Sequence, residues 1–314
     1  MLKLLLFIFL FSIFFFFTKQ QSLPQVMVTD KEISDLVQLF FDSDENAATN
    51  DQIVLNYQNH TTSRDNNGFA SLPLFTEVDP TIAIRPTFKA YYQLMDNYNP
   101  EVGKVETYSE KKEQEIDTFL YLITNTTIGK HFFMFLYKKQ YPYAVTINTF
   151  INFLKNLWFG SYSRARGVLD SSGFEHVFIG ELKKGEVSGL HHWFRFYYLE
   201  ATRNKNKFHY LGYLVKRYNI MASVKFTWFG YYKKSGSFFI TTSPEFDFFV
   251  YTLCFLFRRG NNGCKIEING CPASITSYDL IQNGNIFIGT VFPNIGEMSD
   301  KCKLYNQFVK NNIH

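Results

Sequence analysis

Apolar residues change their spacing near residue 170, and this change restricts the fold more than any other feature of the chain. Before it, they recur every three or four positions, which is typical of one face of a helix. The clearest such run is Ile147, Phe150, Ile151, Leu154, Leu157 and Trp158. After it, most apolar segments are short and bounded by turn residues, which is typical of strands. The sequence therefore predicts an α+β protein, with a mainly helical lobe over residues 22–165 and a β-rich lobe of antiparallel sheets over residues 166–314.

The helical half contains several recognisable elements. Thr29-Asp30-Lys31-Glu32 has the pattern of a capping box, in which the Thr hydroxyl and the Glu carboxylate bind free backbone N–H groups. A helix should begin there. Its buried face should consist of Ile33, Leu36, Val37 and Phe40. We also expect helices over Phe88–Tyr98 and Lys111–Ile123, and a polar loop over Asp42–Arg64.

The second half is expected to contain strands and one further helix. The strands expected from short β-branched and aromatic runs are His176–Leu182, Lys225–Tyr232, Ser237–Thr242, Lys265–Ile268 and Ile286–Val291. Ser243 has the position of a helix cap, and Pro244 that of the first helical residue. The segment that follows is apolar almost all round, so the helix should be buried.

The N-terminus has the composition of a secretory signal peptide. Lys3 precedes the apolar run Leu4–Phe17, and polar residues follow. We predict that residues 1–21 are removed and that the protein is secreted; an uncleaved membrane anchor is the alternative interpretation. The run is shorter than the roughly 18–20 residues that span a bilayer, and no later segment is apolar enough to do so. The sequons at Asn59 and Asn125 are predicted glycosylation sites.

The chain has four cysteines, Cys254, Cys264, Cys271 and Cys302, and an even number in an exported chain suggests disulfides. Asn269-Gly270 is typical of a two-residue hairpin turn. In that hairpin Cys271 faces Ile268 and Cys264 faces Ile275. The two cysteines would then lie about 13 Å apart along the ladder, which is too far for a bond. The remaining connectivity stays open.

Positive charge is concentrated in one part of the chain. The formal net charge is only +4. Residues 155–234, however, contain 14 Lys and Arg residues against five Asp and Glu residues. A basic segment in a nearly neutral chain is typical of a local binding site for a polyanion. For Arg203, Lys205 and Lys207, a solvated loop is an equally good interpretation.

Three segments have a pattern that suggests chemistry. The first is Ser171–Glu181, which contains Phe174-Glu175-His176-Val177-Phe178. The second is Gly189–Trp193, and the third runs from Trp228 through Lys233 to Phe246. In this order they resemble the EndoU endoribonuclease family, and the resemblance extends upstream through Leu94–Tyr98 and Trp158–Tyr162. It covers the chain from about Lys31 to the C-terminus.

The resemblance implies a catalytic group of two histidines and one lysine, which are His176, His191 and Lys233 in this chain. The family commonly has Asn after the second histidine, whereas this chain has His192. Neighbouring residues of an extended segment point to opposite sides, so only one of the two faces the site. The Gly-Leu-His frame favours His191. Judged alone, His176 would more often be a structural histidine, and Lys233 a solvated strand end.

The resemblance implies cleavage of single-stranded RNA on the 3′ side of uridines. The 2′-hydroxyl attacks its own phosphorus and leaves a 2′,3′-cyclic phosphate. A base must take the hydroxyl proton and an acid must protonate the leaving oxygen, and two imidazoles supply both near neutral pH. An ammonium group stabilises the charge on the phosphoryl oxygens. By resemblance, His191 is the base and His176 is the acid. We expect a monomer.

Other residues are implied as supporting groups. Ser237 aligns with a serine that contacts the uracil edge. Thr290 and Phe292 align with a Thr-x-Tyr-Pro segment whose tyrosine stacks on the nucleotide, so Phe292 keeps the stacking and loses a phenolic hydrogen bond. Uridine preference is therefore expected to be weaker than usual in the family. The alternative interpretation of Phe292 is simple core packing.

Glu175 and Glu181 lie close to His176 in the sequence. In an alternating strand they would share the side opposite to it, where they would orient the acid, bind a divalent ion or satisfy buried polar groups. The resemblance implies Mn²⁺ as an activator and not as the catalyst; the ligands are unknown. Two rival functions are a secreted RNA-binding module without turnover and a zinc hydrolase built on His191-His192. The second lacks a His-Glu-x-x-His helix.

Overall fold

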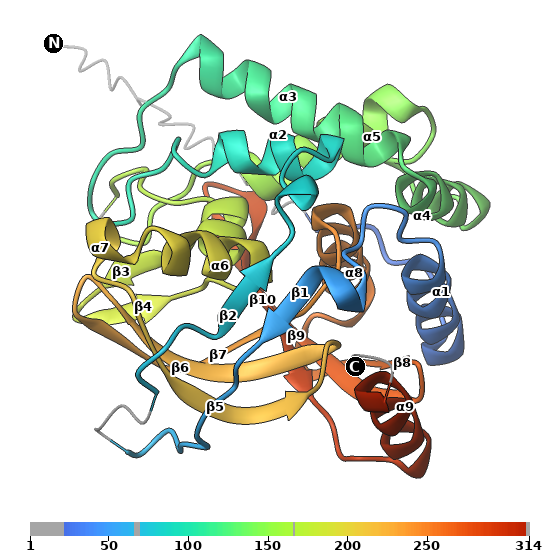
Figure 1. Cartoon of the computed structure of the whole chain (residues 1–314). Helices are drawn as coiled ribbons and strands as arrows, with labels where there is room; N and C mark the ends of the chain where they lie inside the picture. Colours follow the sequence, from blue (N-terminus) through green and yellow to red (C-terminus); the bar gives the residue numbers. More distant parts are fainter. Residues whose placement is uncertain (1–21, 66–69, 166, 312–314) are drawn as a thin grey trace, which may run out of the picture.

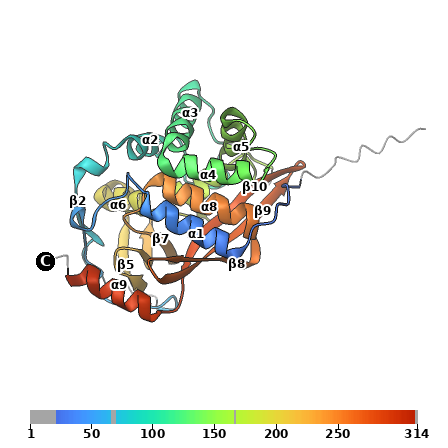
Figure 2. The same ribbon diagram turned by 90° about the vertical axis from the view of Figure 1, so that its right-hand side faces the viewer.

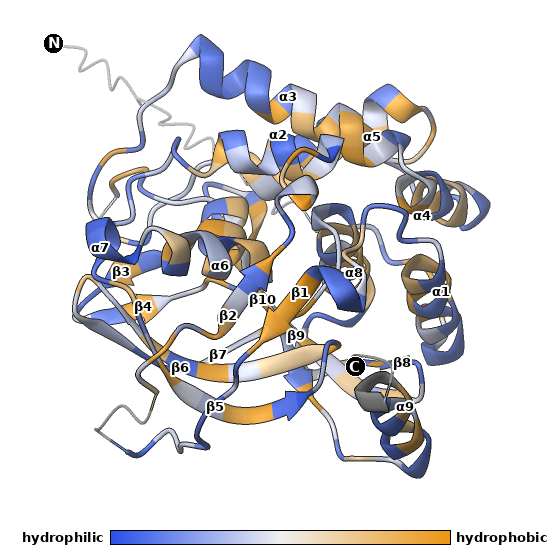
Figure 3. Ribbon diagram, in the orientation of Figure 1, coloured by the Kyte–Doolittle hydropathy of each residue, from blue (hydrophilic) through white to orange (hydrophobic). Residues whose placement is uncertain are grey.

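The computed structural model describes residues 22–65, 70–165 and 167–311 of the chain. It has the predicted α+β architecture, with the early helices packed together on one side and the long strands on the other (Figure 1). The helices of the first half are α1 (Asp30–Asp42), α2 (Pro86–Leu94), α3 (Glu110–Asn125), α4 (Thr127–Lys138) and α5 (Ile147–Phe159). Figure 3 shows that α1 is hydrophilic on one side and hydrophobic on the other.

The capping box at the start of α1 is confirmed. The Thr29 hydroxyl accepts a hydrogen bond from the backbone of Glu32, and the Glu32 carboxylate accepts one from the Thr29 backbone at 2.9 Å. The buried residues of α1 are Ile33, Leu36, Val37 and Phe40, as predicted. The helix expected over Phe88–Tyr98 begins earlier and ends at Leu94. The chain turns there, because Asn97 and Asn99 favour turns over helix.

Two sheets form most of the second half. The five-stranded sheet has the order β3-β4-β7-β6-β5 and the three-stranded sheet has the order β10-β9-β8. Their strands are β3 (Glu181–Lys183), β4 (Glu186–Ser188), β5 (His209–Arg217), β6 (Met221–Trp228), β7 (Tyr231–Phe239), β8 (Gly260–Ile268), β9 (Cys271–Gln282) and β10 (Asn285–Ile295). Pairing within these two sheets is antiparallel except where β4 meets β7, in the parallel pair Glu186 and Tyr232.

Several segments differ from the sequence-based expectation. The strand expected over Lys225–Tyr232 is broken, because Phe229 and Gly230 both have positive φ and form the turn between β6 and β7. The loop expected over Asp42–Arg64 contains the 3-10 helix η1 (Asn50–Gln52) and β1 (Ile53–Leu55), which pairs with β2 (Phe75–Val78). The structure also contains η2 (Pro80–Ile82), α6 (Trp193–Ala201), α7 (Arg203–Asn206) and α9 (Asp300–Asn311).

The buried helix of the second half is confirmed as α8 (Pro244–Arg258). The Ser243 hydroxyl accepts a hydrogen bond from the backbone of Phe246 at 3.1 Å, and Pro244 takes the first turn. Every residue from Pro244 to Leu256 is buried. Figure 2 shows α8 lying between the early helices α4 and α1, and α8 also packs against β8, β9 and β10. This helix therefore joins the two halves through one hydrophobic core.

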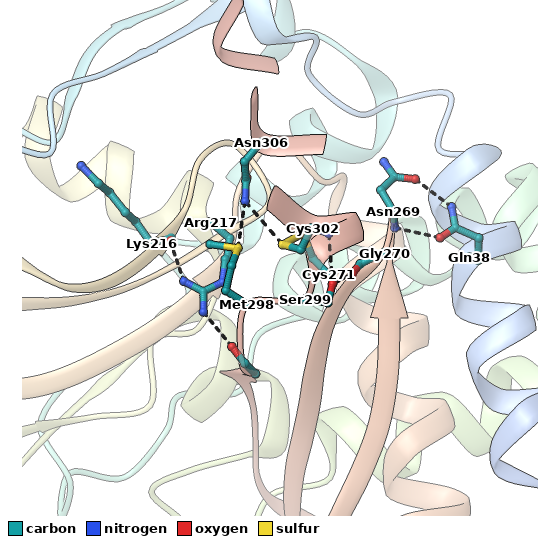
Figure 4. Close-up of a disulfide and its surroundings, with 11 residues drawn as sticks. Gln38, Lys216, Arg217, Asn269, Gly270, Cys271, Met298, Ser299, Cys302 and Asn306 are labelled. Atoms are coloured by element: carbon teal, nitrogen blue, oxygen red, sulfur yellow. Dashed lines mark hydrogen bonds between the residues drawn. A yellow bond between two sulfur atoms is a disulfide. The ribbon is translucent and has the colours of Figure 1, made fainter. Parts of the chain in front are cut away.

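Two disulfides join Cys254 to Cys264 and Cys271 to Cys302. The hairpin register pairs Ile268 with Cys271 and Cys264 with Ile275, so the prediction that Cys264 and Cys271 are not bonded to each other is confirmed. Figure 4 shows how the second bridge ties α9 to the start of β9, beside the Asn269-Gly270 turn. In the part of the chain that the structure describes, no helix has the length and apolarity needed to cross a membrane. The predicted signal peptide, residues 1–21, lies outside that part.

Candidate active site

A groove of about 640 Å³ lies between β7 and β10. It is lined by residues from five strands, from the segment Ser188–His191 and from the turn that carries His176. The lining includes six residues selected from the sequence, which are His176, His191, Lys233, Ser237, Thr290 and Phe292. The two predicted carboxylates, Glu175 and Glu181, are not part of this lining. The structure therefore brings the three implied catalytic side chains into one cavity.

His176 lies in a single turn of π-helix, η3 (Glu175–Ile179). The strand predicted over His176–Leu182 is therefore wrong except at Glu181 and Leu182, which begin β3. The turn is closed by a hydrogen bond of 2.8 Å from the Gly180 N–H to the Glu175 carbonyl. Gly180 has φ of 92°, which ends the turn without steric cost. The aromatic residues that suggested alternation pack together instead, because the rings of Phe174 and Phe178 are stacked with centroids 5.0 Å apart. Burial of these rings overrides local strand preference.

The π-turn also places Glu181 beside His176. The Nδ1 atom of His176 lies 2.7 Å from a Glu181 carboxylate oxygen, and its Nε2 atom lies 3.0 Å from the Thr290 hydroxyl. The prediction that Glu181 points away from His176 is therefore wrong, since it assumed an alternating strand. Glu181 is fully buried, and it is bonded also to the Ser171 hydroxyl and, at 3.2 Å, to the Arg164 guanidinium. The contacts with Ser171 and Arg164 hold the carboxylate in place, and the carboxylate in turn orients the His176 ring.

Charge and burial act in opposite directions in this network. Burial by itself raises the pKa of Glu181, but the His176 ring and the Arg164 guanidinium outweigh it, so the pKa lies below its ordinary value. Burial lowers the pKa of His176 to about 4, while Glu181 pulls it upward. The carboxylate is thus ionised at neutral pH and available to stabilise a proton on His176.

The Gly-Leu-His segment is held against the π-turn by its backbone. The Leu190 N–H donates to the His176 carbonyl at 3.0 Å, and the His191 N–H donates to the Val177 carbonyl at 2.7 Å. Gly189 has φ of 68°, and a Cβ atom at that position would lie 1.7 Å from the His176 carbonyl oxygen. Only glycine fits so close an approach. The glycine of this motif therefore sets the spacing between the two histidines.

His191 is oriented by a backbone group. Its Nδ1 atom lies 2.8 Å from the Ser237 carbonyl oxygen, which accepts hydrogen bonds only. Nδ1 must therefore carry the proton of the neutral ring, and Nε2 carries the lone pair. The ring is stacked on Phe292 with centroids 5.3 Å apart. Burial, followed by the positive charge of Lys233, lowers the pKa of His191 well below its ordinary value. The ring is thus neutral and able to accept a proton.

His192 has a structural position. Its side chain is completely buried, and its Nδ1 atom accepts a hydrogen bond from the Phe194 N–H at 3.2 Å, which caps α6. Burial lowers the pKa of His192 to about 3, so the ring is neutral. Its Nε2 atom lies 3.8 Å from a buried oxygen of Asp247. His192 does not line the groove, and the choice of His191 agrees with the geometry.

Lys233 extends along the wall of the groove from β7 and is half-buried. Burial lowers its pKa to about 8, while the carboxylates of Glu186 and Glu181 oppose that shift. The ammonium therefore carries most of its charge at neutral pH. Among residues 22–65, 70–165 and 167–311, Lys233 has no salt-bridge partner within 4.0 Å. A cation of this kind is available to an anionic ligand.

Glu175 faces away from the groove. It is fully buried, and both of its carboxylate oxygens lack a hydrogen-bond partner. It lines a separate cavity of about 80 Å³ together with Tyr98, Glu106 and Lys112. Burial, followed by repulsion from Glu106, raises the pKa of Glu175 well above its ordinary value. Burial therefore favours the neutral form of Glu175 behind the π-turn, and its carboxyl group is not bonded to His176.

The basic segment contributes less to the groove than its charge suggests. Of those of its Lys and Arg residues that the structure describes, only Arg164 and Lys233 line the cavity. Lys225 is buried and bonded to backbone carbonyls, and Arg195 is buried against the Ile179 carbonyl. Sequence reasoning missed Arg164. It follows directly on Trp158–Tyr162, a segment that carries part of the family resemblance, and this position was the available signal.

The donor groups near the groove do not form a metal site. In the described part of the chain, no three His, Cys, Asp or Glu side chains are grouped to hold a metal ion. Glu181 is committed to His176, Ser171 and Arg164. Glu175 has unpartnered oxygens but faces another cavity. These residues do not fit a divalent ion beside His176 and His191, so no proton transfer is assigned to one.

The site contains the groups of an acid–base enzyme that acts on an anionic substrate. These groups are a neutral imidazole, a second imidazole paired with a carboxylate, and a nearby ammonium.

A family model described as Endoribonuclease XendoU matches residues 32–293. The chain is 37% identical over 276 residues to a uridylate-specific endoribonuclease of Paralichthys olivaceus, covering 85% of this chain and 71% of that protein. It is 37% identical over 273 residues to the uridylate-specific endoribonuclease of Homo sapiens, covering 84% of this chain and 66% of that protein.

The fold agrees with these matches. The solved structure of XendoU, a splicing-independent snoRNA-processing endoribonuclease, superposes with a TM-score of 0.72 at 31% sequence identity. The superposition covers 87% of this chain and 99% of that structure. The chain belongs to the XendoU family of endoribonucleases, as the motifs in the sequence had indicated.

Proposed function

We propose that this protein is a uridylate-preferring endoribonuclease that cleaves single-stranded RNA by attack of the 2′-hydroxyl and leaves a 2′,3′-cyclic phosphate. The observation that carries this proposal is the convergence of His176, His191 and Lys233 on one groove. In support, relatives that are 37% identical are uridylate-specific endoribonucleases. Because this chain spans 66% of the human relative, the whole activity of that protein is a proposal for this one.

The hydrogen bonds of the two rings support a division of roles. His191 presents the Nε2 lone pair, since Nδ1 is bonded to the Ser237 carbonyl at 2.8 Å. It takes the proton of the 2′-hydroxyl as that oxygen bonds to phosphorus. His176 gives the Nε2 proton to the leaving 5′-oxygen. The bond between phosphorus and that oxygen breaks, and no water enters the product.

Protonation of His176 requires an explanation, because its pKa of about 4 in the free protein is low. A bound phosphodiester brings a negative charge into the groove, which opposes the effect of burial. Glu181 adds a second negative charge at Nδ1, 2.7 Å away. Both favour the imidazolium form of His176. Lys233, with a pKa of about 8, stabilises the charge that develops on the non-bridging oxygens.

The remaining groups bind the nucleotide in this proposal. Phe292 offers an aromatic face next to His191, and Ser237 offers a hydroxyl to the uracil edge. Thr290 bonds the acid imidazole and orients it. Mn²⁺ is proposed as an activator outside proton transfer. The protein is proposed to act as a monomer on single-stranded RNA.

Secretion is part of the proposal. Removal of residues 1–21 would release the protein to an oxidising compartment, where the two disulfides persist. Asn59 and Asn125 are exposed, as glycan acceptors must be. Expression of the full chain in animal cells tests this: the protein should appear in the medium, cleaved near residue 21, and lose mass on enzymatic deglycosylation. Retention of the intact N-terminus in the membrane fraction would favour the anchor instead.

The activity is tested with an oligonucleotide that contains one uridine, digested with and without Mn²⁺ and followed by end-group analysis. We expect one cut, 3′ of the uridine, with a cyclic phosphate on one product and a 5′-hydroxyl on the other. Mn²⁺ should change the rate and not the products. Salt-sensitive binding without new ends would instead identify an RNA-binding module.

A further inference from the structure

The groove extends past the catalytic residues along β10. Thr290, Phe292 and Asn294 occupy alternate positions of this strand, and all three line the cavity. Alternate residues of a strand project from one face, so these side chains form a row. At roughly 3.3 Å per residue, Asn294 lies about 13 Å along the strand from Thr290. Nothing in the catalytic mechanism uses Asn294.

The positions of the two histidines give the row a direction. Thr290 is bonded to His176, and Phe292 is stacked on His191. In the proposed reaction, His191 takes a proton from the uridine, whereas His176 protonates the next nucleotide. The uridine therefore lies on the Phe292 side. In that arrangement its base extends along β10 toward Asn294, in the groove that Ser223 and Ser235 also line.

The amide of Asn294 is held in one orientation. Its Nδ2 atom donates to the Thr276 hydroxyl oxygen at 2.8 Å and to the Ser274 carbonyl at 3.4 Å. A carbonyl only accepts, so Nδ2 must be the atom on that side. Both contacts lie on β9, the neighbouring strand. The Oδ1 atom is thereby left as a hydrogen-bond acceptor that cannot exchange places with the donor.

A fixed acceptor separates uracil from cytosine. Uracil carries an N–H donor at N3, whereas cytosine carries a lone pair at the same position. The Ser237 hydroxyl rotates and can either donate or accept, so it suits both bases. An acceptor that cannot rotate suits only uracil, because the lone pairs of cytosine N3 and Asn294 Oδ1 would repel each other.

We propose that Asn294 is a specificity-determining residue of the base subsite, where its Oδ1 atom accepts a hydrogen bond from N3–H of uracil. The inference rests on the proposed ribonuclease function and assigns its base preference to a particular atom. Phe292 lacks the phenolic group that could make a hydrogen bond. The Asn294 amide, two residues further along β10, supplies a hydrogen bond that favours uridine.

The test compares kcat/KM on two oligonucleotides that differ only in one uridine or cytidine. Asn294→Ala should lower the preference for uridine about tenfold, the scale of one hydrogen bond, through slower cleavage at uridine and without any loss of cleavage at cytidine. Asn294→Asp keeps an acceptor oxygen and should keep the preference. Thr276→Val removes the shorter of the two contacts that hold the amide and should lower the preference by a smaller factor. Equal losses at both bases in Asn294→Ala would show that the side chain only holds β10 and would overturn the proposal.

A modified substrate tests the same atom in the unaltered protein. Uridine is replaced by 3-deazauridine, which has a C–H group in place of N3–H. Wild-type protein should cleave 3-deazauridine about tenfold more slowly than uridine. The Asn294→Ala variant should cleave 3-deazauridine no more slowly than wild-type protein does. Equal cleavage of the two substrates by wild-type protein would overturn the assignment while leaving the ribonuclease proposal intact. Failure of wild-type protein to cleave uridine at all would instead overturn the proposed function.

Discussion

The Nδ1 atom of His176 lies 2.7 Å from a carboxylate oxygen of Glu181, whereas the Nδ1 atom of His191 lies 2.8 Å from the carbonyl oxygen of Ser237. The two contacts are similar in length and different in charge. A carboxylate favours a protonated ring, and a carbonyl favours it much less. Two imidazoles in one groove thus have environments that separate their proton affinities, which is what an acid and a base require.

Glu181→Gln should move the pH dependence of cleavage. Glu181 raises the pKa of His176, so its removal lowers that pKa below its present value of about 4. The acid form is lost as pH rises through the pKa, and the falling limb of kcat/KM against pH should move to lower pH. At a fixed pH on that limb, kcat/KM should fall about tenfold for each unit by which the pKa of His176 is lowered. The measurement is the pH profile between pH 4 and 8, values chosen as roughly the range in which imidazole titrates.

Glu175→Gln is the matched control for that variant. Glu175 is also buried beside the π-turn, but burial raises the pKa of its carboxyl group, which favours the neutral form, and the group has no hydrogen-bond partner. A neutral amide of the same shape should leave the profile in place. If Glu181→Gln and Glu175→Gln moved the profile equally, the effect would come from disturbance of the turn and not from the carboxylate.

His191→Ala and His192→Asn should have opposite results. Loss of a general base costs about 10²–10⁴-fold in rate, so His191→Ala should be nearly inactive. His192 caps α6 through Nδ1, and asparagine is a good cap, so His192→Asn should keep activity and stability. Kinetics and thermal melting of both variants provide the measurement. Wild-type activity in His191→Ala would contradict the assignment of the base.

The motifs identified the groove residues, but the sequence did not show how they are arranged. Periodicity and capping were enough for α1, α5 and α8, because long amphipathic or apolar segments leave few alternatives. The five residues of the π-turn fit either strand or helix, and packing of Phe174 and Phe178 decides between them. The error at this turn placed Glu181 on the wrong side of His176.

Long-range contacts explain the rest of what was missed. Arg164 lies in a loop and contacts Glu181, and no spacing in the sequence predicts that contact. The charge of residues 155–234 suggested a basic groove, yet Lys225 and Arg195 are buried against backbone carbonyls. A charge count cannot distinguish a buried cation from an exposed one.

Gly189→Ala should abolish activity and lower stability. The added Cβ atom would lie 1.7 Å from the His176 carbonyl, and the backbone has φ of 68°, which alanine adopts only with strain. The segment that carries His191 would have to move away from His176. Gly185→Ala is the control, because it has φ of 84° but nothing within 4 Å of the added atom. The Gly185→Ala variant should lose stability only through backbone strain, and its kcat should be unchanged. Equal effects of both on kcat would exclude the close approach as the cause.

Removal of the bridge between Cys271 and Cys302 should destabilise the protein. The two cysteines are 31 residues apart, and the bridge holds α9 against the start of β9 (Figure 4). A loop of this length is worth about 2–4 kcal/mol. The double substitution Cys271→Ser with Cys302→Ser should therefore lower the melting temperature by about 3–7 °C, measured by calorimetry. An unchanged melting temperature would show that α9 is held by packing alone.

The substrate supplies its own nucleophile in the proposed reaction, while His176, His191 and Lys233 surround the phosphodiester. The most direct measurement of this central claim uses two oligonucleotides with one cleavable position, which carries uridine in one and 2′-deoxyuridine in the other. We predict that the protein binds both with similar affinity and cuts only the first. A cut at the deoxy position would show that water is the nucleophile and would contradict the proposed reaction.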